Sequence, residues 1–380
     1  MPRRTSPKSR LVVAAGAAAM LVVALHAPSG PEPIRAQDMG GVDGPLPEMM
    51  DRRTVEAIER GLQYLARVQD RSGQWMSHGR VGNYPGSMTA LAGLAMMAGG
   101  STPEEGPYSK EVERAMNYLL KSSQEHDDAL LIGSSGGGRS MYGHGFSMLF
   151  LAQCYGMQSD EEKGEQIRDV LTTGAELTSR SQSDLGAEHD HAGGWYYTPG
   201  SNTDEGSVTV TQLQALRACR NAGIKVNKET IARAVRYLKH CQQADGGICY
   251  SASSRGSSRP AISAAAIACF YAAGVYDREA GGSGDEAKMV ERLVDYCQSH
   301  MRVDGGMGHY FYAHYYYAQA LYQRGGEDWE AYYPKIRDRL LASQAPDGSW
   351  NGDGTGTVYG TALALTILQL PYGYLPIYER

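Results

Sequence analysis

The sequence predicts an all-α fold in which six helix pairs close into an α/α toroid of twelve helices, arranged as an inner and an outer ring. Amphipathic helical segments alternate along residues 51–380 with segments that are apolar nearly all round, and the alternation has a period of roughly 55 residues. The first and last units carry no polar capping face, which an open stack of repeats would need. A closed ring of one domain, 51–380, satisfies both observations.

The last unit shows the pattern most clearly. Residues 336–341 have the mixed charged and apolar pattern of an outer helix, whereas residues 361–370, TALALTILQL, carry no charge and predict a buried inner helix. A turn with the spacing Q-x3-G-x-W joins the two helices, and the first unit has the same turn before an inner helix at 87–100. The turn residues of the two units are Gln69, Gly73, Trp75, Gln344, Gly348 and Trp350.

Glycines mark the ends of the other inner helices. We expect a left-handed cap after five of them, because glycine adopts that conformation without steric cost. These glycines are Gly99, Gly156, Gly223, Gly274 and Gly325. The sixth inner helix stops at Pro371, which cannot continue a helix.

The N-terminus has the pattern of an export signal. Residues 1–27 hold four basic residues and no acidic one, followed by an uncharged stretch at 11–25. That stretch is shorter than the roughly 20 residues of a membrane span, so we expect export to the periplasm or outside the cell, with an uncleaved anchor as the alternative. Residues 28–50 read as a Pro/Gly-rich linker. No stable membrane span is expected once the signal is removed.

The charge balance excludes one class of partner. The formal net charge is −6, and removal of the basic signal makes the chain more negative. A chain with an acidic excess is a poor ligand for phosphate backbones, so no nucleic-acid partner is expected.

Cysteine and tyrosine usage leaves alternatives open. An exported chain permits disulfides, and the candidate bridges are Cys241–Cys297 and Cys241–Cys249, with free thiols as the alternative. No C-x2-C pair exists for a zinc-finger-type site. The chain has 25 Tyr but 4 Phe, which indicates either half-buried tyrosines around a wet cavity or helices that pack with Tyr in place of Phe.

The repeated turns, together with D-G-G at Asp245 and Asp304, resemble the repeats of squalene and oxidosqualene cyclases and of protein prenyltransferase β subunits. The resemblance covers about 330 residues. It implies a barrel of six helix pairs with a central cavity facing the N-termini of the inner helices. It also implies that the Gln and Trp turns are structural, with each Trp stacking on the next unit.

The chemistry of that family is missing from this chain. The D-x-D-D acid motif of the cyclases is absent, and the candidate catalytic acids are Asp204 and Glu205, whose alternative role is to cap an inner helix. His314 matches one zinc position of the prenyltransferases, but the D-x-C ligands are absent. His189 and His191 flank Asp190 in a polar loop and are the other metal candidate, which we interpret as solvated. No metal and no cofactor is therefore predicted.

Aromatic and histidine side chains at the turns and at the starts of the inner helices are predicted to line one concave pocket. They are Tyr142, His144, Trp195, Tyr196, Tyr250, His309, Tyr312, His314 and Tyr359. Arg139 lies in a Gly-rich loop nearby and is a candidate anion contact.

The predicted function is that of an exported toroid that binds a ligand or serves as a scaffold, with a lipid, an isoprenoid or a glycan as the ligand class. One alternative is a cyclase-like enzyme for isoprenoids or lipids with an atypical acid, which needs a dry, apolar cavity. The other is a polysaccharide-active α/α barrel, which needs two carboxylates across the groove. The sequence offers carboxylates from one unit and no obvious partner across the ring, so whether the chain is an enzyme stays open.

Overall fold

The computed structural model describes residues 46–80, 82–124, 139–184, 192–272 and 284–378. The chain divides into an N-terminal unit, residues 1–32, and a helical unit, residues 33–380, which holds all the described residues. The predicted export signal, most of the predicted linker, the His189 to His191 loop and Gly274 lie outside the described ranges.

The described residues form twelve α-helices in six consecutive pairs, as predicted. The outer helices are α1 (Arg52–Val68), α3 (Ser109–Gln124), α5 (Glu161–Arg180), α7 (Lys228–Cys241), α9 (Gly284–His300) and α11 (Gly326–Ser343). The inner helices are α2 (Pro85–Ala98), α4 (Ser140–Tyr155), α6 (Gly206–Asn221), α8 (Pro260–Ala272), α10 (Tyr310–Arg324) and α12 (Thr357–Gln369).

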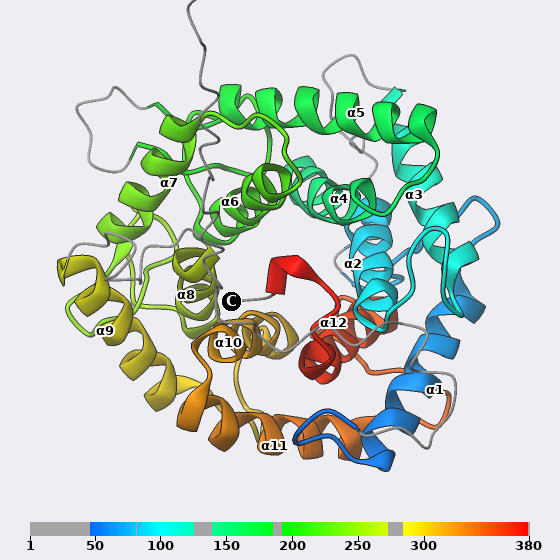
Figure 1. The fold of residues 1–380 in the computed structure, drawn as a ribbon. Helices are drawn as coiled ribbons and strands as arrows, with labels where there is room; N and C mark the ends of the chain where they lie inside the picture. The colour runs from blue at the N-terminus through cyan, green and yellow to red at the C-terminus, as the bar shows by residue number, and fades with distance from the viewer. Residues whose placement is uncertain (1–45, 81, 125–138, 185–191, 273–283, 379–380) are drawn as a thin grey trace, which may run out of the picture. The chain divides into compact units, whose positions relative to one another are not determined.

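The inner helices close into a ring. Each packs against the next, from α2 through α4, α6, α8 and α10 to α12, and α12 packs back against α2. The outer helices surround this ring, so the helical unit is an α/α toroid (Figure 1). Burial follows the sequence pattern, because every residue of α2 is buried whereas α1 buries a single stripe that includes Ile58, Leu62 and Leu65.

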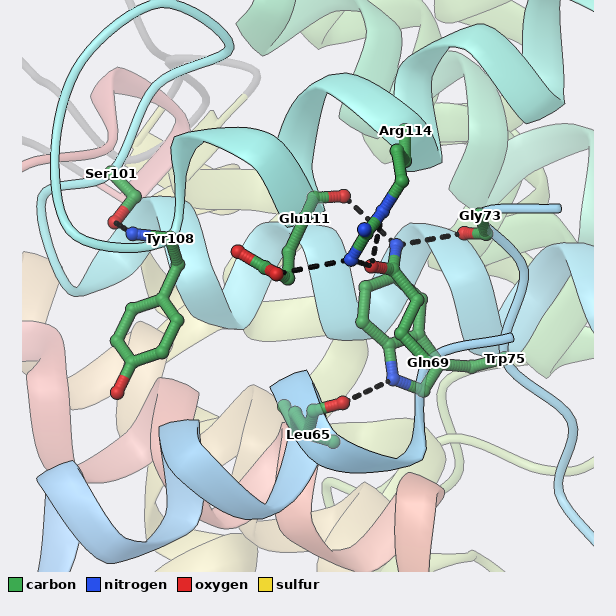
Figure 2. A network of polar contacts seen from close by, with 8 residues as sticks. All are labelled: Leu65, Gln69, Gly73, Trp75, Ser101, Tyr108, Glu111 and Arg114. Carbon is green, nitrogen blue, oxygen red and sulfur yellow. Dashed lines mark hydrogen bonds and ion pairs between the residues drawn. The ribbon is translucent and has the colours of Figure 1, made fainter. Parts of the chain in front are cut away.

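The Gln and Gly of each turn clamp one unit to the next. The side-chain amide of Gln69 donates to the carbonyl of Gly73 in its own turn, at 3.0 Å, and to the carbonyl of Glu111 in α3, at 2.9 Å (Figure 2). Arg114 of α3 donates back to Oε1 of Gln69 at 2.6 Å. Gly73 has φ +95, and a Cβ there would lie 2.2 Å from the Arg114 carbonyl oxygen. Only glycine fits this approach.

The Trp of the turn ties the turn to both helices of its own unit. The indole Nε1 of Trp75 donates to the carbonyl of Leu65 in α1, at 2.9 Å (Figure 2). Its backbone N–H donates to the hydroxyl of Thr89 in α2, at 3.0 Å. Because the ring is 1% exposed, Trp75 fills the space where the two helices meet.

The same contacts recur around the ring. In four turns a glutamine amide donates to the carbonyl of the glycine four or more residues on and to a carbonyl of the next outer helix. These glutamines are Gln69, Gln182, Gln242 and Gln344. Gln344 donates to Ala57 of α1 at 2.8 Å, so the clamp of the last unit holds the first unit and closes the circle.

The glycine caps differ in part from the expectation. Gly223 and Gly325 have the positive φ values of +81 and +67 that were predicted. Gly99 and Gly156 have φ values of −86 and −75 and are not left-handed. After α2 the positive φ belongs to the following residue, Gly100, at +88, because a second glycine there takes the turn.

The C-terminal segment covers one end of the ring. The short helices η2 (Leu370–Tyr372) and η3 (Pro376–Tyr378) follow α12 and lie within the inner ring (Figure 1). The Tyr378 hydroxyl hydrogen-bonds with the Tyr315 hydroxyl of α10 at 3.1 Å. The segment enters the ring at the end where the inner helices terminate. The N-terminal ends of the inner helices form the opposite face of the ring. None of the described helices is long and apolar enough to cross a membrane.

Candidate functional site

Glu205 stands at the start of α6 and is fully buried. Its carboxylate accepts hydrogen bonds from the backbone N–H groups of Ser207 and Val208, at 3.1 and 2.8 Å, and from the Ser207 hydroxyl at 2.7 Å. This is the capping role that the sequence offered as the alternative to acid catalysis. Burial raises the pKa of Glu205, although the capping hydrogen bonds oppose the shift.

Tyrosine hydroxyls surround this carboxyl group. The Tyr142 hydroxyl of α4 hydrogen-bonds with the Ser207 hydroxyl, and the Tyr197 and Tyr250 hydroxyls hydrogen-bond with each other. Tyr250 also interacts with Glu205. The guanidinium of Arg139 lies over the Tyr197 ring, 4.7 Å from its centroid, so the predicted anion contact is engaged in a cation–π interaction. These residues come from the starts of α4 and α6 and from the turns before α6 and α8, so they belong to three consecutive units.

Two further tyrosines reach the cluster from the opposite side of the ring. Tyr312 of α10 interacts electrostatically with Tyr142, Glu205 and Tyr359 of α12. Its hydroxyl is buried and has no hydrogen-bond partner. A buried hydroxyl without a hydrogen-bond partner lowers the stability of the folded state. The Tyr312 hydroxyl lies among several polar groups and is therefore available to hydrogen-bond with a ligand.

These tyrosines keep accessible surface deep inside the ring. Burial is the largest cause of the raised pKa values of Tyr142, Tyr312 and Tyr359, yet all three side chains are only half-buried. These half-buried aromatic side chains are therefore the candidate lining of a pocket. We define the tyrosine cluster as Tyr142, Tyr197, Tyr250, Tyr312 and Tyr359 with Glu205 and Ser207.

Asp204 has a different role from the predicted acid. It is 2% exposed and accepts hydrogen bonds from the Tyr237 hydroxyl at 2.7 Å and from the backbone N–H groups of Ala252 and Ser253 at 2.6 and 3.2 Å. Burial raises its pKa, but these hydrogen bonds outweigh burial and leave the pKa below its ordinary value. An ionised carboxylate with its lone pairs engaged cannot act as a general acid. Asp204 instead fastens the turn after α7 to the start of α6.

Two of the three predicted pocket histidines, His144 and His314, point away from the cluster. Nε2 of His144 lies 3.2 Å from the carbonyl of Gly174 and 3.0 Å from the hydroxyl of Thr178, both in α5. His314 hydrogen-bonds with the Tyr332 hydroxyl of α11 at 2.8 Å. Both imidazoles therefore pack between the rings, and burial lowers the pKa of each from 6.5 to about 4. The sequence prediction missed this because a buried helix has no outward face that pattern alone can identify.

Three other predicted pocket residues have separate places. Trp195 is fully buried and its Nε1 donates to the Thr178 carbonyl at 2.8 Å, which is the structural role of Trp75 in its own unit. His309 is exposed in a left-handed conformation before α10. Tyr196 is half-buried and packs on Tyr197, with ring centroids 4.7 Å apart. Tyr196 contacts the tyrosine cluster through its ring, and Trp195 contacts it through its backbone carbonyl, which accepts the Glu205 N–H at 2.8 Å.

Asp353 is a residue that the sequence analysis missed. It lies in the turn before α12, with φ +49, and accepts a hydrogen bond from the Phe311 N–H at the start of α10, at 2.8 Å. Burial raises its pKa while backbone N–H groups of α10 oppose the shift, and its charge acts on Tyr359. The available signal was a carboxylate directly before an inner helix, the same signal that identified Glu205.

Metal ligation finds no support among the described residues, where no group of three or more His, Cys, Asp and Glu side chains could hold an ion. All six thiols are free and buried. The predicted bridge between Cys241 and Cys297 is absent, whereas Cys241 does lie beside Cys249.

No known protein family and no characterised protein matches the chain in sequence. Solved structures match in fold. The type II terpene cyclase MstE from Scytonema, in complex with geranylgeranyl dihydroxybenzoate, superposes with a TM-score of 0.53 at 15% identity, over 85% of this chain and 98% of the cyclase. The GH76A α-1,6-mannanase from Salegentibacter sp. HEL1_6 superposes with a TM-score of 0.62 at 10% identity, over 83% of this chain and 98% of the mannanase.

A protein from Actinoplanes also matches, with a TM-score of 0.53 at 14% identity, over 84% of this chain and 99% of that protein. At these identities the likeness concerns the fold alone. The chain thus has the α/α toroid fold that a terpene cyclase and a glycan hydrolase share, as the resemblance of the repeats predicted.

Proposed function

We propose that the helical unit binds a neutral, polyhydroxylated ligand of the oligosaccharide class in the recess formed by the tyrosine cluster. The observation that carries the proposal is the convergence of tyrosine hydroxyls from α4, α10 and two turns on one buried carboxyl group, Glu205. One of these hydroxyls, that of Tyr312, is buried without a partner.

The lining favours a polar ligand over an isoprenoid. Tyrosine offers an aromatic face for stacking and a hydroxyl for hydrogen bonding, which together suit sugar rings. A hydrocarbon chain in the same place would leave the buried Tyr312 hydroxyl without a partner, at a cost of about 1–3 kcal/mol. The Glu205 carboxyl group, whose oxygens already accept from Ser207 and Val208, can also accept a hydrogen bond from a ligand hydroxyl.

The fold neighbours are consistent with either ligand class. One binds a geranylgeranyl compound, and an inactive variant of the other, with two Asp to Asn substitutions, binds α-1,6-mannotriose. The chemistry of the cluster therefore has to decide between them, and it supports the glycan.

Titration calorimetry with defined probes tests the proposal. α-1,6-Mannotriose, cellotriose and maltotriose serve as neutral polyhydroxylated probes, and geranylgeraniol in detergent serves as the apolar probe. We expect saturable binding of at least one trisaccharide, with a Kd of about 1 mM or tighter, and none of geranylgeraniol. Binding of geranylgeraniol alone would contradict the proposal.

Matched variants locate the binding. Tyr312→Phe and Tyr142→Phe each remove one hydroxyl of the cluster and are expected to weaken trisaccharide binding about tenfold. Tyr155→Phe is the control, because Tyr155 is the last residue of α4 and lies at the opposite end from Tyr142. Equal losses in all three variants would argue against the site.

A second candidate function is hydrolysis of the bound glycan. Glu205 and Asp353 precede α6 and α12, which stand opposite each other in the ring. The pKa of both carboxyl groups is raised, that of Glu205 by full burial and that of Asp353 by partial desolvation of a side chain that keeps solvent exposure. Each carboxyl group interacts with a tyrosine of the cluster. Asp353 is thus the partner across the ring that the sequence did not offer. Glycoside hydrolysis needs such a pair, with one carboxyl protonating the leaving oxygen while the other activates water or attacks the sugar.

Release of reducing ends from the three trisaccharides tests this second function. Glu205→Gln is expected to lower the rate at least about 100-fold while the trisaccharide still binds, and Asp295→Asn, on the exposed face of α9, is the control. If the wild-type protein binds a trisaccharide and releases no reducing ends, the chain is a binding protein and the hydrolase reading is wrong.

A further inference from the structure

We propose that Cys241 and Cys249 form an oxidisable dithiol, and that their disulfide fastens the turn that carries Tyr250 against the start of α6. The pair is independent of the proposed ligand. It concerns the turn between α7 and α8, where Gln242 and Ile248 form an isolated antiparallel bridge.

The backbone register places the two cysteines opposite each other. Cys241 and Cys249 are the next pair outward from the Gln242 and Ile248 bridge, and the Cys249 N–H donates to the Cys241 carbonyl at 3.1 Å. Residues paired in this way have Cα atoms about 4.5–5.5 Å apart and side chains on the same face. Disulfides need Cα separations of about 4.4–6.8 Å, so the bond can form with little backbone movement.

The two thiols influence each other's pKa, as expected of neighbouring side chains on one face of the paired backbone. The Cys249 thiol also donates to the Ser251 carbonyl at 3.3 Å. The neighbouring Cys241 thiol lowers the pKa of Cys249 to about 6, and Cys249 raises that of Cys241. The thiolate is the nucleophile in disulfide exchange, so Cys249 is the sulfur that reacts first.

The other cysteines have no such neighbour. The Cys154 thiol faces the sulfur of Met97, and the Cys269 thiol donates to the Val210 carbonyl. Burial alone raises the pKa of Cys297. Cys241 and Cys249 are therefore the pair of thiols that is positioned to form a disulfide.

The oxidant is a small or protein disulfide of an oxidising compartment. The Cys249 thiolate attacks one of its sulfur atoms, forms a mixed disulfide and releases one thiol. Cys241 then loses its proton, attacks the Cys249 sulfur and releases the second thiol. The protein gives up two electrons and the oxidant is reduced to two thiols. Both sulfurs are buried, so the exchange takes place before the turn closes during folding or when it opens.

The disulfide between Cys241 and Cys249 would affect the tyrosine cluster through the turn that carries Tyr250. Tyr250 directly follows Cys249, its carbonyl accepts the Gly206 N–H at 2.8 Å, and its hydroxyl belongs to the tyrosine cluster. Two further residues of the same turn, Ala252 and Ser253, donate backbone hydrogen bonds to the Asp204 carboxylate. A covalent link at the first residue of this turn removes its freedom to open.

The thiol state of the full-length protein tests the inference. The chain is refolded with oxidised and reduced glutathione, denatured in N-ethylmaleimide and mapped by peptide mass spectrometry. We expect Cys241 and Cys249 to be recovered as a linked pair and the other four cysteines to be alkylated. Modification of all six cysteines, or a link between any other pair, would overturn the proposal.

A second measurement separates the link from folding defects. In the wild-type protein, reduction is expected to speed amide exchange of residues 250–259 about tenfold or more. Cys249→Ser should show the fast rate under both conditions, whereas Cys297→Ser should keep the difference. An exchange rate that is the same before and after reduction would contradict the tether even if the bond forms.

Discussion

At the scale of single residues, the buried polar side chains divide into those that organise the fold and those that face the recess. Asp204 and His314 hydrogen-bond with neighbouring structure, and His144 does so through Nε2 while its buried Nδ1 has no partner. Glu205 shares its hydrogen bonds between the helix start and the tyrosine cluster. The sequence could not predict which of these side chains belong to which group, because the sequence pattern of a buried helical repeat does not show in which direction an acid or a histidine points.

His144 and His314 predict acid sensitivity. Both are neutral when folded, with pKa values lowered from 6.5 to about 4 by burial. Below pH 6.5 the unfolded chain takes up protons that the folded chain refuses, so stability falls as pH decreases from 6.5 toward 4. Each group contributes about 3 kcal/mol over that range.

Urea unfolding at pH 7 and pH 5 measures this effect. The His144→Gln/His314→Gln variant is expected to lose less stability between the two pH values than the wild-type protein, whereas the exposed His309→Gln control should match the wild type. A steeper loss in the double variant would show that the two imidazoles are not the source.

Asp204→Ala separates a structural carboxylate from a catalytic one. The substitution leaves the buried Ala252 N–H, the more exposed Ser253 N–H and the Tyr237 hydroxyl without their acceptor, so the free energy of unfolding is expected to fall by about 3 kcal/mol. Asp295→Ala on α9, an exposed site, should change it by less than about 0.5 kcal/mol. Equal stabilities in chemical denaturation would refute the anchoring role.

At the scale of elements, the sequence predicted the helices well and their termini less well. Apolar runs such as 361–370 gave the inner helices, because a helix without a polar face must be buried on all sides. The caps of α2 and α4 were wrong in detail, since Gly99 and Gly156 have negative φ. A glycine permits a left-handed cap without requiring one.

The turn glycines differ from the cap glycines in this respect. Gly73→Ala places a Cβ 2.2 Å from the Arg114 carbonyl oxygen at a φ of +95, and we expect a loss of at least about 2 kcal/mol in unfolding free energy. At Gly156 φ is −75 and no atom lies within 4 Å of the added Cβ, so Gly156→Ala should be nearly neutral. Thermal unfolding of both variants tests the pair, and similar midpoints would show that the clamp tolerates a side chain.

At the scale of the helical unit, the ring was predicted from the absence of capping units, and the structure supplies the contact that closes it. Gln344 donates to Gly348 in its own turn and to Ala57 at the other end of the domain. The recess could not be predicted in the same way. Its tyrosines come from five separate turns and helix starts, and which of the 25 tyrosines meet depends on side-chain direction and not on spacing.

Gln344→Ala tests ring closure. It removes the hydrogen bonds of Gln344 with Ala57 and Arg60, both of which join residues far apart in sequence, and is expected to cost about 2 kcal/mol of unfolding free energy. Gln63→Ala is the control, because Gln63 is exposed on α1 and bonds only within its helix. Amide exchange in α1 should become faster in Gln344→Ala than in the control, and unchanged exchange there would show that other contacts hold the first unit.

Hydrogen exchange of the wild-type protein with and without a saturating trisaccharide tests the central claim, that the ligand site lies at the N-terminal ends of the inner helices. We expect slower exchange in residues 195–207, 249–253 and 310–316, and no change in α1, α3 or η3. Protection confined to the outer helices or to the C-terminal segment would contradict the claim and place the ligand elsewhere on the toroid.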